Sequence, residues 1–283
     1  MNDMILASVV TKNHLKEFLF LKFSAEYYHT CEWYVYCDSY CYTYLKQYDN
    51  MNVFEANIGD GKVWGSKEEK DSFYKTILTK FDACHKALDE HKYVLFVDSD
   101  IVFTNHCCSL FEEFVESDLD VVASPHYQLA PEIDRDWGVF NVGFVLIKSK
   151  DLLNRWKEIT LSKTYLYEQK PLEVAMLEGK FKWDTFPITY NMGWWRFNNQ
   201  KTHNRFESLD CQRNKISYAG VPIISFHTHM FNTEDHPQCE ELTKFLMNAF
   251  TTLSAYKEFS KKYNEILGIS TPQPPSPPIM GLP

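Results

Sequence analysis

The first hundred residues alternate between short continuous apolar runs and stretches whose apolar residues recur at helical spacing. Continuous runs of strand length occur at 4–10, 32–37, 52–58 and 93–97. Residues 15–23 have the helical spacing, and a longer helix is predicted after Ser66, which forms a capping box with Glu69. The apolar stripe of this second helix consists of Phe73, Ile77, Phe81, Cys84 and Leu88. The order strand, helix, strand, strand, helix, strand predicts an α/β sandwich with a mainly parallel sheet.

The second part of the chain has a more mixed pattern. Further strands are predicted at 120–123, 140–147 and 221–226. Helices are predicted at 110–115, after a cap at Asp151, at 169–177 and from Asp235 onward. From residue 268 the chain is rich in Ser, Thr and Pro, which predicts a flexible tail at 268–283 that adds nothing to the core. We therefore expect one folded domain over 1–267.

Composition narrows the classes of protein. The 283 residues are 45% hydrophobic and 24% charged, which is typical of a globular chain with a large core and excludes wholesale disorder. With 29 basic and 38 acidic side chains the formal net charge is −9. This balance argues against nucleic acid as a partner, because binding a phosphate backbone requires clustered Lys and Arg. Aromatic residues make up 16% and suit both apolar cores and platforms for flat ligands such as bases and sugars.

The remaining sequence signals concern location. The amino terminus lacks the basic segment of a secretory signal, and no stretch approaches the roughly 20 apolar residues of a membrane-spanning helix. The eight cysteines show neither the paired spacing of a structural zinc site nor a small disulfide framework. We therefore expect no membrane span, reduced cysteines and a cytoplasmic location.

Two carboxylates follow the apolar run at 93–97, in the sequence Val97-Asp-Ser-Asp100. Burying either carboxylate without a partner would cost several kcal/mol, so a cation is expected to meet them. Mg²⁺ or Mn²⁺ is the natural candidate, because proteins hold these ions with one or two carboxylates together with substrate phosphates. The alternative is a turn in which Asp98 and Asp100 are solvated or cap the next element.

Two histidines, His227 and His229, directly follow the last predicted strand. Strand alternation would place both imidazoles on the same side. If this strand end lies beside Asp98 and Asp100, one of the two histidines completes the metal site as a neutral nitrogen ligand. The alternative is a pair of hydrogen-bonded histidines in a loop.

Three further segments carry groups that a ligand could approach. Gly143 interrupts the strand at 140–147, which often marks close approach by a ligand or another backbone, and Asn141 beside it is both donor and acceptor. The alternative there is a β-bulge with a capping Asn. Glu168 and Gln169 open a helix, where they could face a ligand or reflect simple first-turn placement of an acid. The aromatic loop at 190–195 could wall a sugar site or merely pack.

In this order and spacing, the motifs resemble those of the GT-A nucleotide-diphospho-sugar transferases. The resemblance is to the branch with the retaining plant-type xylosyl- and galactosyltransferases and the glycogenin-like enzymes, and it covers residues 4–232. The matching segments are 11–13, a helix bearing Lys80, 97–100, 140–144, 168–169, 187–191 and a histidine after the final strand. There are two departures. Residues 228–237 lack the glycine and the Lys-Pro-Trp of the glycogenin-like enzymes, including their phosphate-clamping lysine, and Glu168 stands where the family usually has Asp.

The resemblance implies a Rossmann-like, mainly parallel central sheet flanked by helices, with a smaller mixed region on the acceptor side. It divides the single catalytic domain into a nucleotide-binding half at 1–103 and an acceptor-binding half at 104–267. The implied donor is a nucleotide-diphosphate sugar, expected to be a UDP-sugar, and the implied acceptor is a sugar or glycan. The implied donor-binding residues are Val10, Thr11, Asn13, Asp38, Lys80, Asp98, Ser99, Asn141 and Gly143.

The resemblance also implies metal-dependent transfer. The implied ligands of Mn²⁺ or Mg²⁺ are Asp98, Asp100 and one of the two histidines His227 and His229. Asn141, Glu168 and Gln169 would position the donor sugar and the acceptor. We expect retention of the anomeric configuration, in which the departing phosphate takes the acceptor proton and no carboxylate base is required. An inverting enzyme would need such a base, and Asp136 or Glu168 would then be the candidate.

Two other functions stay open at this point. The haloacid-dehalogenase phosphatases also place an Asp-x-Asp motif after an apolar strand, with the first Asp as nucleophile and the second as general acid. Their motif normally ends the first strand, whereas three strands are predicted before residue 98 here, and no later paired-aspartate motif follows. The other alternative is a non-catalytic carbohydrate-binding protein that has kept the transferase fold.

Overall fold

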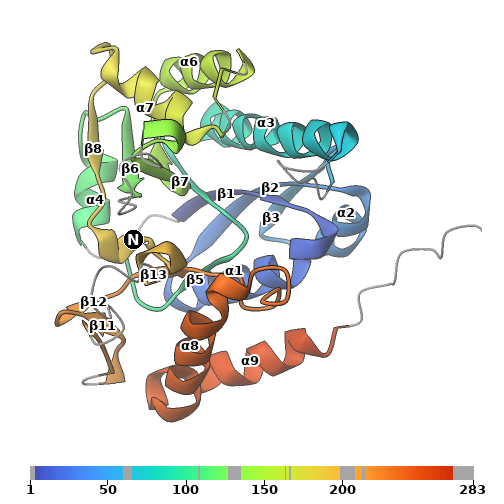
Figure 1. Cartoon of the computed structure of the whole chain (residues 1–283), viewed down its shortest axis with the longest axis vertical. Helices are drawn as coiled ribbons and strands as arrows, with labels where there is room; N and C mark the ends of the chain where they lie inside the picture. Colours follow the sequence, from blue (N-terminus) through green and yellow to red (C-terminus); the bar gives the residue numbers. More distant parts are fainter. Residues whose placement is uncertain are drawn as a thin grey trace, which may run out of the picture.

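The computed structural model describes residues 4–59, 66–107, 109–126, 135–162, 164–165, 167–197, 208–211 and 214–269. Its centre is a seven-stranded sheet in the order β3-β2-β1-β4-β7-β6-β8 (Figure 1). The strands are β1 (Met4–Val10), β2 (Cys31–Cys37), β3 (Met51–Glu55), β4 (Val94–Val97), β6 (Val121–Pro125), β7 (Phe140–Ile147) and β8 (Trp183–Thr185). Strands β3, β2, β1 and β4 are parallel neighbours, β7 runs antiparallel to β4 and β6, and β8 is parallel to β6. The predicted α/β class with a mainly parallel sheet is confirmed.

Helices cover both faces of this sheet. One face carries α3 (Lys67–Glu90), α6 (Lys150–Leu161) and α7 (Gln169–Leu177), and the other carries α1 (Leu15–Tyr28), α8 (Glu240–Thr252) and α9 (Lys257–Leu267) (Figure 1). Two shorter helices are α2 (Ser39–Leu45) and α4 (Ser109–Glu116). Short 3-10 turns are η1 (Lys12–His14), η2 (Ile188–Tyr190), η3 (Trp194–Arg196), η6 (Pro237–Cys239) and η7 (Ser254–Tyr256).

Helix α3 begins where the sequence predicts. The Ser66 side chain accepts a hydrogen bond from the backbone N–H of Glu69, and the Glu69 carboxylate accepts one from the backbone N–H of Ser66. The apolar stripe then packs on β1, β2 and β4, with Ile77 and Phe81 buried. The same face buries Lys80, whose four-carbon stem crosses the apolar layer and brings its ammonium group to the end of β4.

A small second sheet positions the residues that follow β4. It has the order β5-β13-β9, formed by β5 (Ile101–Phe103), β13 (Ser225–His227) and β9 (Met192–Gly193). Strand β13 is antiparallel to β5, and His227 is directly opposite Ile101. This pairing brings a segment from late in the chain beside the acidic motif that lies between β4 and β5.

The strand predicted at 221–226 is wrong as a single element. It divides into β12 (Val221–Pro222), which joins β10 (Leu209–Asp210) and β11 (Ser217–Tyr218) in a third small sheet, and β13 in the second sheet. Between them the N–H of Ile223 donates to the carbonyl of Ile216 and that of Ile224 to the carbonyl of Thr189. The chain therefore changes sheets in the middle of an apolar run, which periodicity alone does not reveal.

Other differences concern helix ends and short helices. Helix α6 is capped by Ser149, whose hydroxyl accepts from the N–H of Leu152, and not by Asp151. Helix α2 is not predicted, because its tyrosine-rich sequence has no clear apolar stripe, and α9 is missed because only Phe259 and Ile266 of it are buried. The carboxy-terminal helix predicted from Asp235 is preceded by the turn η6, so α8 starts later.

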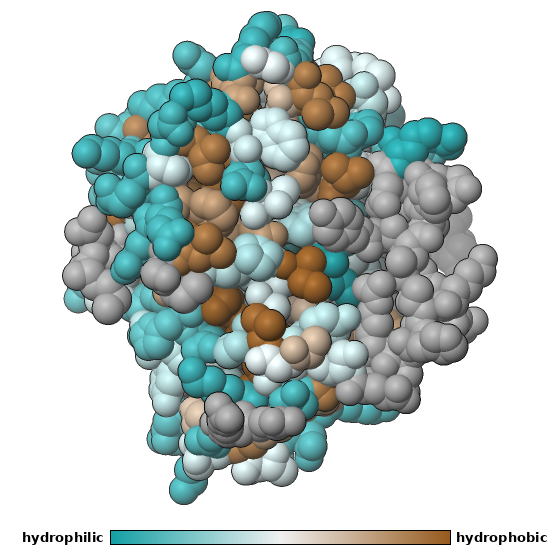
Figure 2. All heavy atoms as spheres, turned by 90° about the vertical axis from the view of Figure 1, so that its left-hand side faces the viewer, coloured by the Kyte–Doolittle hydropathy of each residue, from teal (hydrophilic) through white to brown (hydrophobic). Residues whose placement is uncertain are grey.

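On the face toward β8 and β12, apolar and polar side chains alternate in small patches (Figure 2), and the exposed Trp183 and Val221 belong to these two strands. No described helix is both long enough and apolar enough to cross a membrane. The seven described cysteines are free thiols. The tail predicted at 268–283 lies outside the described residues from 270 onward.

Candidate active site

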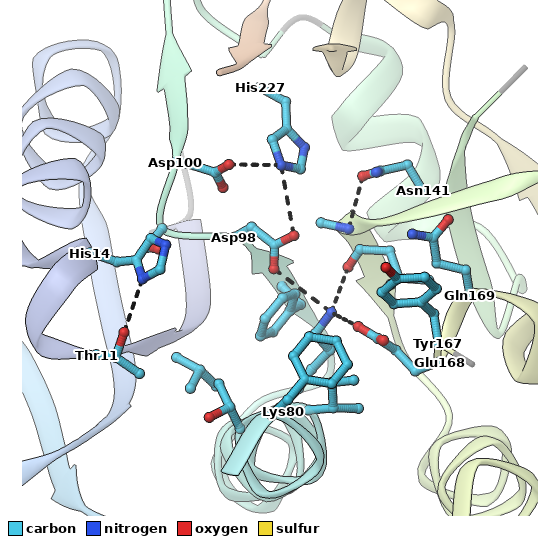
Figure 3. A pocket seen from close by; sticks show the side chains of 18 of the residues that line it. Thr11, His14, Lys80, Asp98, Asp100, Asn141, Tyr167, Glu168, Gln169 and His227 are labelled. Carbon is cyan, nitrogen blue, oxygen red and sulfur yellow. Dashed lines mark hydrogen bonds and ion pairs between the residues drawn. The ribbon is translucent and has the colours of Figure 1, made fainter. Parts of the chain in front are cut away.

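The predicted site residues meet at a cavity of about 400 Å³ at the carboxyl ends of β1 and β4 (Figure 3). Open α/β sheets place ligands at this edge, because loops and helix starts converge there. The predicted residues that line the cavity are Thr11, Lys80, Asp98, Ser99, Asp100, Asn141, Gly143, Glu168, Gln169, His227 and His229. Residues from six separate segments of the chain thus face one space.

The acidic motif and a histidine form the group of potential metal ligands. One ligand atom each of Asp98, Asp100 and His227 lies within 4.8 Å of the others. His227 Nε2 is 3.2 Å from Asp100 Oδ2 and 3.9 Å from Asp98 Oδ2. The backbone fixes this arrangement, since the N–H of Asp98 donates to the carbonyl of Gly143 and the N–H of Thr228 donates to the carbonyl of Asp100.

The charges in this group are coupled. Burial alone would raise the pKa of Asp100, but the facing imidazoles of His227 and His229 lower it below the ordinary value for Asp. Burial likewise opposes protonation of His227, yet Asp100 and Asp98 raise the pKa of its imidazole. Burial lowers the pKa of His229 to about 4, because the opposing charge of Asp100 only partly offsets it and the nearby imidazoles lower it as well. An ionised carboxylate is therefore favoured at residue 100.

The residues of this group fit a divalent ion. Asp98 and Asp100 supply oxygens and His227 an imidazole nitrogen, a set that suits Mn²⁺ or Mg²⁺ when phosphate oxygens complete it. The Nδ1 atom of His227 is buried and has no hydrogen-bond partner. His229 also approaches Asp100 Oδ2, at 3.2 Å from its Nε2, but it groups with His14 and His236 rather than with the two aspartates.

Gly143 makes room for this group. A Cβ atom at this position would lie 2.3 Å from Asp98 Oδ2 and 2.6 Å from His227 Cε1. The close approach predicted from a glycine within the strand is therefore present. The alternative, a β-bulge with a capping Asn, is present as well. The register between β6 and β7 shifts next to Gly143, and Asn141 Oδ1 accepts a hydrogen bond from the Gly143 N–H at 3.0 Å.

Replacing Gly143 by Ala is expected to destabilise the protein by about 1–3 kcal/mol, because the new methyl group must displace Asp98 or His227. Urea unfolding measures this change. Gly268→Ala is the matched control, since a Cβ there meets only ordinary contacts of 3.5 Å or longer. Equal stabilities of the two variants would contradict the tight packing at Gly143.

Lys80 is a buried cation that links three segments of the site. Its Nζ lies 2.7 Å from Glu168 Oε1 and 3.7 Å from Asp98 Oδ1, and it donates to the carbonyl of Val142 at 3.3 Å (Figure 3). Burial disfavours the charged form, but Glu168 and Asp98 outweigh it and raise the pKa of Lys80. Glu168 precedes α7, where its carbonyl accepts from Trp156 Nε1 at 2.7 Å. Its carboxylate is thus engaged by Lys80.

The neighbouring Gln169 is differently placed. It lines the cavity, and its Oε1 is buried without a hydrogen-bond partner. A buried amide oxygen without a partner costs free energy unless a ligand or water supplies a donor. Gln169 is therefore the amide best placed to meet a polar group of a bound ligand.

Four predicted site residues do not line the cavity that the described residues form. Val10 is fully buried in β1, and Asn13 is exposed. The Asp38 carboxylate caps α2 through the N–H of Cys41 and accepts from the N–H of Lys12 at 2.6 Å, which gives it a structural role at the end of β2. Asp136 is exposed and paired with the adjacent Arg135 at 2.9 Å. Their roles in donor binding and catalysis stay predictions.

The sequence reasoning missed several residues of the cavity. Those with polar or aromatic side chains are His14, Phe73, Thr76, Phe96 and Tyr167. His14 Nδ1 is hydrogen-bonded to Thr11 Oγ1 at 2.9 Å, and its position four residues after the end of β1 was an available signal. Tyr167 packs against Phe73 with ring centroids 5.8 Å apart. The aromatic loop at 190–195 mainly packs: Tyr190 and Trp195 are buried.

A buried carboxyl group anchors the segment that carries the histidines. Glu17, on α1, accepts hydrogen bonds from the N–H groups of Met230 and Phe231 at 3.2 and 2.8 Å. Burial, opposed by these hydrogen bonds, raises the pKa of Glu17 to about 8. The chain just after His229 is thus held to α1 by a group that is mostly protonated in the folded protein at neutral pH.

This anchor predicts a pH dependence of stability. Unfolded Glu17 ionises near its ordinary pKa of 4.5, whereas the folded group keeps its proton to about pH 8, so the unfolded state binds fewer protons between these values. The free energy of unfolding is then expected to fall from pH 5 to pH 8 by up to about 1.4 kcal/mol per pH unit from this group. Urea unfolding of wild type and Glu17→Gln across this range isolates the contribution. Parallel pH profiles of the two proteins would contradict it.

Comparison with known proteins agrees with this geometry. A family model for nucleotide-diphospho-sugar transferases matches residues 35–218, well over half of the chain. No curated protein sequence matches the chain significantly. The apo form of the glycosyltransferase GlyE of Streptococcus pneumoniae TIGR4 superposes on this chain with a TM-score of 0.55 and 13% identity. The match covers 93% of this chain but only 63% of the GlyE chain.

Two other solved structures match over nearly their whole length. The galactosyltransferase LgtC, in complex with donor and acceptor sugar analogs, has a TM-score of 0.52 and 12% identity over 94% of this chain and 98% of its own. Mouse xyloside xylosyltransferase 1 has a TM-score of 0.51 and 13% identity over 81% of this chain and 98% of its own. At such identities these structures establish the fold alone. The family model shows that the chain belongs to the nucleotide-diphospho-sugar transferase family of glycosyltransferases.

Proposed function

We propose that this glycosyltransferase uses a divalent cation, Mn²⁺ or Mg²⁺, to transfer a sugar from a UDP-sugar to a carbohydrate or glycan acceptor with retention. The observation that carries the proposal is the convergence of Asp98, Asp100 and His227 within 4.8 Å at the floor of the cavity. Asp98 and Asp100 lie between β4 and β5, and His227 comes from β13, far later in the chain. A divalent cation would compensate the charge of the buried Asp100 and of the half-buried Asp98 beside it.

Asp98, Asp100 and His227 would hold the ion. When bound, it would act as a Lewis acid that neutralises the charge developing on the leaving diphosphate. Of the two predicted histidines, the geometry favours His227, because His229 lies outside the group formed with Asp98. The facing imidazoles lower the pKa of the buried Asp100 carboxyl, which favours the ionised form that binds a cation.

The nucleotide is proposed to bind toward the ends of β1 and β2. Thr11 and His14 line the cavity there, and Val10, Asn13 and Asp38 belong to the same ends of these strands. The donor diphosphate and sugar would then lie between the acidic group and the start of α7, where Asn141 and Gln169 face the cavity. This leaves the nucleotide in the half at 1–103 and the acceptor in the half at 104–267.

The carboxylates of the cavity support retention. Among the described residues, its lining contains three carboxylates: Asp98 and Asp100 face the proposed cation, and Glu168 is bonded to Lys80 at 2.7 Å. Asp136 lies outside the lining and pairs with Arg135. A base for an inverting reaction has to reach the acceptor hydroxyl within hydrogen-bond distance. With no described carboxylate free in the cavity, transfer of the acceptor proton to the departing phosphate is the simpler course.

The extra methylene of Glu168 fits this arrangement. Its side chain reaches Lys80 directly, and Lys80 in turn lies beside Asp98. We therefore assign Glu168 a positioning role, acting through Lys80 on the acidic group, and assign contact with the donor sugar to Gln169 and Asn141.

Thermal unfolding with a panel of nucleotide-sugars, each with and without Mn²⁺, tests the proposal. A donor at about one hundred times its Kd stabilises by about 2.7 kcal/mol, which corresponds to a rise in Tm of roughly 5–10 °C. We expect this rise only when a UDP-sugar and Mn²⁺ are both present, and its loss on adding EDTA. A rise with a non-uridine donor would contradict the assignment of the nucleotide.

Turnover assays separate the remaining alternatives. Proton NMR of the new glycosidic bond reports its anomeric configuration, and an inverted product would contradict retention. Phosphate release from simple phosphate esters without sugar transfer would favour a phosphatase. Binding of a UDP-sugar with no transfer or hydrolysis across an acceptor panel would favour a non-catalytic carbohydrate-binding protein.

A further inference from the structure

A second cluster of potential ligands lies at the rim of the cavity and is not used by the proposed reaction. It consists of His14 in η1, His229 two residues after β13, and His236 just before η6. One ring nitrogen of each lies within 4.8 Å of the others. The ring centroids of His229 are 6.0 Å from His14 and 3.6 Å from His236. Three imidazoles from separate segments thus share one small volume.

Hydrogen bonds orient two of these rings in the way that metal ligands are oriented. A histidine that binds a metal through one ring nitrogen commonly bonds a carboxylate or another oxygen through the other. His229 has Nε2 at 3.2 Å from Asp100 Oδ2, while its Nδ1 is buried with no hydrogen-bond partner. His14 has Nδ1 at 2.9 Å from Thr11 Oγ1. The cluster therefore has both the ligand atoms and the outer partners of a metal site.

The chemistry of the donors selects the ion. Three nitrogen donors without a carboxylate suit a borderline-soft ion such as Zn²⁺, which takes three protein ligands and a water in an open tetrahedral site. Mg²⁺ and Mn²⁺ prefer oxygen, which the neighbouring group of Asp98 and Asp100 provides. We propose that His14, His229 and His236 form a second metal site that takes Zn²⁺, separate from the carboxylate site and oriented by Asp100.

Binding requires a small rearrangement. The rings of His229 and His236 are nearly parallel, with 15° between their planes, and the lone pairs of parallel rings do not converge on one point. His229 is held by Asp100, and the chain after it is held by Glu17. His236, half-buried like the other two, is the ring that would have to turn, away from its contact with Gln238 at 3.5 Å. Zn²⁺ would thereby tie the segment after β13 to η1, just before α1.

Cobalt(II) provides a spectroscopic test that needs neither donor nor transfer activity. Co²⁺ replaces Zn²⁺ in nitrogen-rich four-coordinate sites and absorbs strongly in the visible there, whereas six-coordinate, oxygen-rich Co²⁺ absorbs weakly. Titrating Co²⁺ into the metal-free protein is expected to give one equivalent of the strong bands. One equivalent of Zn²⁺ should remove them. Absence of strong bands in wild type would overturn the proposal.

Variants locate the site. His236→Ala and His236→Gln are expected to weaken Co²⁺ binding by roughly 100-fold or more, because loss of even an outer partner of a metal ligand costs 10–100-fold. Asp98→Asn and the exposed His106→Ala should keep the strong bands. Unchanged bands in both His236 variants, or loss of the bands in Asp98→Asn or His106→Ala with thermal unfolding intact, would place the ion elsewhere and overturn the proposal.

Discussion

Asp100→Ala is expected to lower Mn²⁺-dependent sugar transfer and donor hydrolysis by about 1000-fold, or about 4 kcal/mol of transition-state stabilisation. The Nε2 atoms of His227 and His229 each lie 3.2 Å from Asp100 Oδ2. The backbone carbonyl of Asp100 accepts a hydrogen bond from the N–H of Thr228, just after β13. Removing the side chain deletes a ligand from the centre of the group while leaving that backbone bond in place. Initial rates at saturating Mn²⁺ and UDP-sugar measure the loss.

Two controls keep this result specific. Asp100→Asn is close in shape but is a weaker ligand, so it should lose most of the activity with little change in Tm. Asp89→Ala removes an exposed carboxylate paired with Lys150 on the surface and should leave transfer unchanged. Full Mn²⁺-dependent activity in Asp100→Ala would contradict the assignment of the metal site.

Lys80→Met is expected to destabilise the protein by about 3–5 kcal/mol, the cost of leaving a buried charge without its partner. The side chains of Lys80 and Glu168 are only 6% and 9% exposed, and they are 2.7 Å apart. Without Lys80, the buried Glu168 carboxylate would have to stay ionised with no cation beside it or take up a proton. The free energy of unfolding from urea titration measures the effect.

The double variant Lys80→Met/Glu168→Met separates the buried pair from general packing. Replacing both charges by apolar side chains of similar volume is expected to recover much of the lost stability, since neither charge is then left alone. Lys86→Met is the matched control on the same helix: Lys86 pairs with Glu90 at 2.8 Å on the surface, and its loss should change stability little. A double variant less stable than Lys80→Met would contradict this account of the pair.

Much of the site follows from the sequence because of one geometric regularity. Asp98 and Asp100 follow an apolar strand, and polar residues at the carboxyl ends of neighbouring parallel strands must meet at one edge of the sheet. Thr11 follows by the same reasoning, whereas His227 reaches the site through β13, which lies in the second sheet and runs antiparallel to β5. Lys80 is expected only from the family resemblance, and the structure places it on the buried face of α3.

The remaining features depend on contacts that no local pattern contains. The pairing of Lys80 with Glu168 joins residues 88 positions apart, and the anchoring of Phe231 by Glu17 joins residues 214 apart. Which histidine joins the aspartates depends on the change of sheet between β12 and β13, which an unbroken apolar run conceals. The cap that Asp38 provides for α2 is also hidden from the local pattern, because α2 itself is not predicted.

The central claim is that one divalent cation joins Asp98, Asp100 and His227 to the diphosphate of the donor. Crystals grown with UDP and Mn²⁺ test it directly through anomalous scattering at the manganese absorption edge. The account predicts an anomalous peak bound by these three side chains, with diphosphate oxygens completing the ligand set. UDP bound in the cavity with no manganese at the aspartates, or manganese bound only elsewhere, would contradict it.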